Sequence, residues 1–81
     1  METRMAIIGI FVYNRDSADR INDLLHEYRQ YIIGRMGLPY REKDVSVITV
    51  VVDAPEMEIG ALSGKLGMVR DVQVKTAYSK L

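Results

Sequence analysis

The sequence contains no cysteine and a single histidine, and none of its apolar runs is longer than a β-strand. Without a thiolate, the chain has no cysteine nucleophile and no cysteine ligand for zinc or an iron–sulfur cluster. No leader typical of a signal peptide opens the chain, and no segment approaches the roughly 20 apolar residues that a membrane-spanning helix needs. These absences predict a soluble, cytoplasmic protein that has no membrane partner.

Charges of the two signs balance, because eleven lysine and arginine residues face eleven aspartate and glutamate residues. Proteins that bind nucleic acid on their own usually have a basic excess or a basic stripe, so we do not expect nucleic-acid binding through this chain alone. A net charge near zero also weakens self-repulsion. Since a single core in 81 residues is only marginally stable without disulfides, this composition favours self-association.

The residues that carry most enzyme chemistry are sparse. His26 lies on the polar side of a predicted helix, where Asp23 and His26, three residues apart, could offer two ligands, which are too few for a transition-metal site. None of the four serines has a histidine in its sequence context, and no glycine-rich phosphate loop is present. We therefore predict that the protein is not an enzyme and has no metal site or cofactor.

Two segments, Met5–Tyr13 and Val45–Asp53, are apolar at both alternating sets of positions. A strand with one wet face would be polar at every second residue, so both segments are predicted to lie mid-sheet and to be covered on both sides. The second segment has β-branched residues at almost every position, as is typical of buried strands.

The remaining segments predict two helices and two less apolar strands. Apolar residues recur at helical spacing over Ser17–Gln30 and again over Pro55–Gly67, where the proline favours a helix start. Shorter strands are expected over Tyr31–Met36 and Met68–Tyr78. Because Pro39 has no N–H, we do not expect the ladder of the earlier strand to extend as far as this residue.

The order strand, helix, strand, strand, helix, strand is the split βαβ arrangement of ferredoxin-like domains. With right-handed crossovers, it predicts one α+β domain over residues 1–81. That domain is a βαββαβ sandwich with a four-stranded antiparallel sheet in the order 4-1-3-2 and two helices on one face. The two most apolar segments then become the central strands, so local pattern and chain order agree.

Two helices cover only one side of such a sheet, which leaves one apolar set on each central strand without cover. Each exposed side chain would forgo about 1.5–3 kcal/mol of burial, and together they would exceed the patch that a monomer usually tolerates. We therefore expect a homo-oligomer, a dimer or tetramer, built on the open sheet face. The residues assigned to this interface are Ile8, Ile10, Val12, Val47 and Val51.

Two polar clusters are candidates for ligand binding. Their members are Asn14, Arg15 and Asp16 after the first strand, and Arg35, Tyr40 and Arg41 around the predicted hairpin. Arginine suits a carboxylate or a phosphate because its planar fork presents two aligned donors. A solvated loop remains the alternative interpretation of both clusters.

Three stretches resemble one family of small proteins. They are IGRMGLPYRE at residues 33–42, LSGKLG at 62–67 and VQVKT at 72–76. Over nearly its whole length the chain is similar to the iron-only hydrogenase system regulators. The resemblance implies an ACT-like, ferredoxin-like fold, related in shape to the effector domain of nickel-responsive repressors. It also implies an association with hydrogenase maturation and, as in ACT-like domains, an effector site near the first strand–helix turn.

Residues and resemblance together predict a non-enzymatic, oligomeric ACT-like regulatory domain. We expect it to bind a small effector or a protein partner in connection with iron-only hydrogenase expression or maturation, with a shift in subunit packing as its output. Two alternatives remain open at this stage. One is a metal-responsive or DNA-binding transcriptional regulator, and the other is a structural assembly partner among hydrogenase-system proteins.

Overall fold

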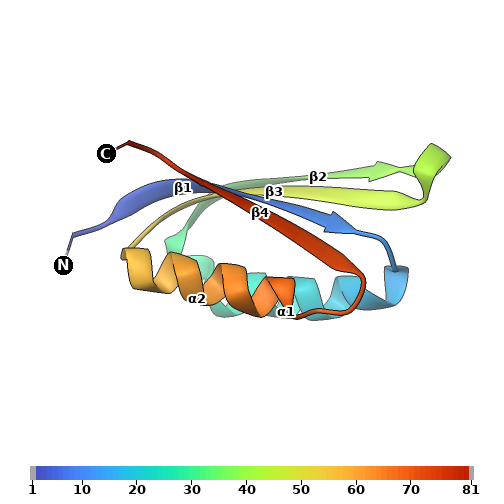
Figure 1. Cartoon of the computed structure of the whole chain (residues 1–81), viewed down its shortest axis with the longest axis horizontal. Coiled ribbons are helices and arrows are strands. Elements are labelled where there is room, and N and C mark those ends of the chain that lie inside the picture. The colour runs from blue at the N-terminus through green and yellow to red at the C-terminus, as the bar shows by residue number, and fades with distance from the viewer. Residues whose placement is uncertain (1, 81) are drawn as a thin grey trace.

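The two segments that are apolar on both faces form the central strands of a four-stranded antiparallel sheet (Figure 1). In the computed structural model, which describes residues 2–80, β1 comprises Arg4–Val12 and β3 comprises Val45–Ala54. The edges are β2 (Ile32–Tyr40) and β4 (Val72–Tyr78), which gives the order β2-β3-β1-β4. This is the predicted order read from the opposite edge, so the ferredoxin-like topology is confirmed.

Both α-helices, α1 (Ala18–Glu27) and α2 (Glu56–Gly67), lie on the same side of the sheet (Figure 1). The first predicted helix is in fact a ten-residue α-helix with a 3₁₀ turn on either side. The 3₁₀ turns of the chain are η1 (Arg15–Ser17), η2 (Arg29–Tyr31) and η3 (Arg41–Lys43). Within residues 2–80, neither α-helix has the length and apolar character needed to cross a bilayer.

A single hydrophobic core fills the space between the helices and the sheet face that they cover. Its largest fully buried side chains are Ile8, Ile10, Ile21, Leu24, Leu25, Ile59, Leu62, Leu66, Val50 and Val52. The helix members recur at spacings of three and four, so each helix presents one continuous apolar stripe to the sheet. Each such side chain stabilises the fold by about 1.5–3 kcal/mol, which makes this layer the main source of stability.

The other side of the sheet carries a second apolar set, which we call the open face. Residues directly opposite one another in a ladder share a face, and the register places Ile7 opposite Val51 and Phe11 opposite Val47. The apolar members of the open face are Met5, Ile7, Phe11, Met36, Leu38, Tyr40, Val45, Val47, Val51 and Ala77. Many of these side chains are strongly exposed, with Leu38 at 58% and Ile7 at 51%.

The assignment of Ile8, Ile10 and Val12 to an interface on the open face is wrong. These residues lie on the helix-covered face and are buried in the core of the chain itself. Both alternating sets of β1 are apolar, so composition does not reveal which one the helices cover, and a shift of one residue exchanges them. Val47 and Val51, the other two assigned residues, do lie on the open face.

The two edge strands differ from prediction at their ends. β2 continues through Pro39, which lies opposite Ser46, and ends only at Tyr40. Proline is tolerated here because β2 is an edge strand, where a residue without an N–H can face solvent without breaking the ladder. β4 begins at Val72 rather than Met68, because the residues between α2 and β4 form a turn.

Candidate functional site

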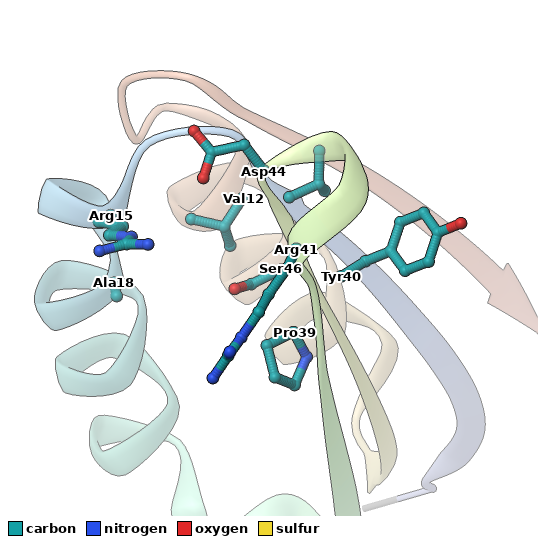
Figure 2. A pocket seen from close by; sticks show the side chains of 9 residues that line it. Val12, Arg15, Ala18, Pro39, Tyr40, Arg41, Asp44 and Ser46 are labelled. Carbon is teal, nitrogen blue, oxygen red and sulfur yellow. The ribbon is translucent and has the colours of Figure 1, made fainter.

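A cleft of about 530 Å³ opens between the beginning of α1 and the β2–β3 hairpin (Figure 2). It is lined by Val12, Arg15, Ala18, Pro39, Tyr40, Arg41, Asp44, Val45 and Ser46. The end of β1 and the first turn of α1 supply an apolar floor, and the rim is mostly polar. We call this space the hairpin cleft. It lies within the size range of small-molecule sites, about 300–1,000 Å³.

Arg15 and Arg41 approach the hairpin cleft from opposite walls. Arg15 is the first residue of η1 and Arg41 the first residue of η3, and both side chains extend toward the space between helix and hairpin (Figure 2). Neither guanidinium has a hydrogen-bond or ion-pair partner among residues 2–80. Two cationic forks are therefore available to an incoming anion.

The turn that carries Arg15 is fixed by its own side chains. The Asn14 Oδ1 atom accepts a hydrogen bond of 3.0 Å from the backbone N–H of Asp16, which caps the 3₁₀ turn. The buried Ser17 hydroxyl donates to the carbonyl of Arg70. Because Arg70 precedes β4, this bond ties the β1–α1 turn to the α2–β4 turn and holds the base of Arg15 in place.

The other wall is a tight hairpin tip. The N–H of Asp44 donates to the carbonyl of Arg41 at 3.1 Å, and Asp44 itself has a positive φ of 53°. Aspartate tolerates this left-handed conformation better than most residues do. The tip thus fixes the backbone of Arg41, while the Asp44 carboxylate points away from the Arg41 guanidinium (Figure 2).

The six residues predicted to bind a ligand fall in three places. Arg15 and Arg41 both line the hairpin cleft. Tyr40 also lines it, but its ring points away (Figure 2), since the residue belongs to the open face. Asn14 and Asp16 line a second cleft of about 500 Å³ with Arg20, Lys65 and Arg70 among its other lining residues. Arg35 lies in neither cleft and donates to the Asn22 Oδ1 atom of α1 at 2.9 Å.

The sequence interpretation missed Ser46 and Asp44 as lining residues of the hairpin cleft. Ser46 belongs to the helix-facing set of β3, and its hydroxyl points toward the cleft (Figure 2). Alternation along β3 was a usable signal for Ser46, because it is the one polar member of an otherwise apolar set. For Asp44, only the tip geometry brings the residue to the rim.

A metal centre has no obvious location in the described part of the chain. Within residues 2–80, no three histidine, cysteine, aspartate or glutamate side chains come close enough to share a metal ion. His26 occupies the last turn of α1, away from both clefts. The arginines of the hairpin cleft therefore remain the clearest groups through which the chain could hold a ligand.

Two solved structures with low sequence identity share the fold. One is the C-terminal domain of the MgtC protein from Mycobacterium tuberculosis, with a TM-score of 0.76 and 9% identity over 95% of this chain and 88% of that one. The other is an unknown protein from Galdieria sulphuraria, with a TM-score of 0.65 and 13% identity over 99% of this chain and 47% of that one. At these identities the likeness extends to the fold alone. No curated protein sequence matches the chain.

A third solved structure is much more similar. The uncharacterized protein TM1266 from Thermotoga maritima has a TM-score of 0.93 and 39% identity, over 98% of this chain and 100% of that one. The model of the family described as "TM1266-like: Iron-only hydrogenase system regulator, putative" matches residues 4–76. That match spans both central strands, both helices and the two walls of the hairpin cleft. The chain therefore belongs to the TM1266-like family.

Proposed function

We propose that the protein is a non-enzymatic regulatory domain of the iron-only hydrogenase system that works as an assembly of identical chains. In this proposal two copies pack through their open faces, and each binds a small effector in its hairpin cleft. The observation that carries the proposal is the open face itself, an apolar surface with no cover from the chain's own helices. The family to which the chain belongs supplies the link to hydrogenase regulation.

The size of the open face fits a second copy of the chain. Four strands about 4.8 Å apart and about 30 Å long present a flat area of roughly 580 Å². Protruding side chains raise the accessible area, so two copies would bury roughly 1,200 Å² or more in total, which reaches the range of specific protein interfaces. Left in water, a patch of this size lies at the upper end of the largest patches found on typical monomers, about 300–600 Å².

Charge on the open face also suits a self-complementary contact. Among the four strands, the charged side chains on this face are Asp53 on β3 and Lys75 on β4. They have opposite signs and lie on different strands, so two copies can meet without a cluster of like charges. An interface core depleted in charge and rich in Met, Phe and Tyr is typical of protein–protein contacts.

The hairpin provides a physical connection between effector and assembly. Tyr40 and Arg41 are consecutive residues, with the Tyr40 ring on the open face and the Arg41 side chain in the hairpin cleft. A ligand that draws Arg41 toward α1 therefore also moves the backbone that positions Tyr40. Such a movement changes the packing of the open faces, which is the coupling between two sites that regulation requires.

Sedimentation velocity at micromolar concentration tests the assembly. The intact chain should sediment at a multiple of its 9.2 kDa, and Ile7→Glu should reduce it to the monomer because a carboxylate would be buried in the contact. Met57→Glu is the matched control, since Met57 is 82% exposed on α2, away from the sheet. Circular dichroism verifies that both variants are folded. A compact monomer of the intact chain would contradict the proposal.

A further inference from the structure

We infer that the hairpin cleft binds a phosphate monoester, with the phosphoryl group held between Arg15 and Arg41. This inference deepens the proposed function, because it names the ligand class of the same cleft. Both guanidiniums extend into one space, and neither has a partner among residues 2–80 (Figure 2). Arg4 pairs with Glu56, and Arg35 donates to Asn22. Arg20 also has no partner among residues 2–80, but it alone of the three unpaired arginines lies in the second cleft.

The number of donors favours phosphate over carboxylate. A guanidinium fork donates two parallel hydrogen bonds, so one arginine already occupies both oxygens of a carboxylate. A phosphate monoester has three free oxygens and a charge of about −1.5 to −2 at neutral pH, so it can accept hydrogen bonds from two forks that line one cleft. The hydroxyl of Ser46, which points into the cleft from β3, is a further donor for the remaining oxygen.

The rest of the cleft limits what the phosphate is attached to. Val12 and Ala18 form an apolar floor beside the two arginines, so the organic group attached to the phosphate can pack against a hydrocarbon surface. The Asp44 carboxylate points away from the Arg41 guanidinium but stays at the rim, where it would repel a further anionic group on a larger ligand. The ligand class is therefore a phosphate on a small neutral body, and a polyanion is disfavoured.

Backbone rigidity on both walls supports tight binding. The β1–α1 turn is held by the Asn14 cap and by the bond from Ser17 to Arg70, and the hairpin tip is closed by the bond between Asp44 and Arg41. When a ligand arrives, the arginine side chains become ordered, and the closed hairpin tip shifts with Arg41 as one unit. The entropy cost of binding is correspondingly limited to a few rotatable groups.

The experiment is a titration of the ¹⁵N-labelled full chain with phenyl phosphate, followed by NMR. We expect saturable shift changes at residues 14–18 and 39–46. Arg15→Ala and Arg41→Ala should each weaken binding by about 10-fold or more, the loss expected for a hydrogen-bonded charge pair. Arg15→Lys should give an intermediate loss, because it keeps the charge and removes the fork. Arg20→Ala, which removes the same charge on the second cleft, should leave affinity within about 2-fold.

Three outcomes would overturn the inference. The first is a titration that does not saturate at about 10 mM phenyl phosphate, because the affinity would then be too weak for a specific site. The second is an equal loss in Arg20→Ala, since that would show general charge attraction. The third is equally tight binding of benzoate, which has the same ring with a carboxylate. Sedimentation of the same samples distinguishes the two proposals. An oligomer that does not bind phenyl phosphate would contradict only the ligand class, and a monomer that binds it would contradict only the assembly.

Discussion

Ile7 lies directly opposite Val51 in the ladder between β1 and β3, on the side of the sheet that neither helix covers. Its neighbour Ile8 lies opposite Val50 and is fully buried beneath the helices. Two consecutive isoleucines of one strand therefore have identical side chains in opposite environments, since one is half exposed and the other is fully buried. This contrast separates the forces that fold one chain from those available to bring two chains together.

Replacing these two residues by alanine should have very different effects on stability. Ile8→Ala should lower the free energy of unfolding by about 2–5 kcal/mol, because it leaves a cavity in a packed core. Ile7→Ala should cost less than about 1 kcal/mol in dilute solution, since the side chain is half exposed. Urea denaturation followed by circular dichroism measures both changes. Similar losses in the two variants would show that the register of β1 is wrong.

Protein concentration makes the same pair informative about assembly. If open faces pack together, the cost of Ile7→Ala should grow as the concentration rises, because binding to the native state stabilises it by mass action. The cost of Ile8→Ala concerns the interior of one chain and should change much less. If the loss of stability in Ile7→Ala did not change with protein concentration, this result would contradict the contact between open faces.

The Ser63 and Thr76 side chains should show energetic coupling across the helix–sheet boundary. Their hydroxyl oxygens lie 2.8 Å apart, joining α2 to β4 in a partly buried position. Ser63→Ala or Thr76→Val alone should cost about 0.5–1.5 kcal/mol, because each leaves the other hydroxyl without this partner. The double variant should cost less than the sum, as a double-mutant cycle in urea would measure.

A control cycle for this pair combines Ser63→Ala with Gln73→Ala. Gln73 lies opposite Phe11 on the open face and accepts a hydrogen bond from Tyr13, so it has no contact with Ser63. These two changes should be additive within about 0.5 kcal/mol. Additivity in the Ser63 and Thr76 cycle as well would show that their contact contributes nothing measurable.

The strand order could be predicted because the apolar pattern of each segment and the order of the segments along the chain are both visible in the sequence. Val45 and its successors are β-branched at almost every position, and such a run fits only the middle of a sheet. What could not be predicted is which apolar set of β1 the helices cover. That choice depends on register and crossover geometry, and it cannot be inferred from Ile7 and Ile8, which are the same residue type. The interface residues on β1 were therefore assigned to the wrong face.

The candidate site was predictable only in part for a related reason. Arg15 and Arg41 stood out as arginines in turns, and the split βαβ order brings those two turns to the same end of the sheet. Arg35 looked equally suitable in sequence, but its strand position directs it to Asn22 on α1. Which polar residues of a loop share a cleft is decided by side-chain direction, which the sequence pattern does not specify.

The tip of the β2–β3 hairpin should be sensitive to the residue at position 44. Asp44 has a left-handed backbone, which β-branched residues adopt at high cost, so Asp44→Val should destabilise the chain by about 1–2 kcal/mol. Asp44→Gly should be nearly neutral, because glycine adopts this conformation freely but loses more entropy on folding. Lys43→Val, one residue earlier and without a positive φ, is the control in the same urea measurement. Equal tolerance of valine at both positions would contradict this tip geometry.

Lys65 on α2 should titrate at a higher pH than an ordinary lysine. The Tyr28 side chain, first, and then the Glu27 carboxylate raise the pKa of Lys65, because both lie beside its ammonium group and favour its charged form. A raised pKa in the folded state means that these contacts stabilise the fold below about pH 10.5 and that this contribution disappears as the pH rises through the folded value. Tyr28→Phe and Glu27→Gln should each lower the pKa of Lys65 in an NMR titration of its side-chain methylene signals. Glu58→Gln, whose carboxylate instead accepts from Tyr31, should leave it unchanged, and equal shifts in all three variants would contradict the assignment.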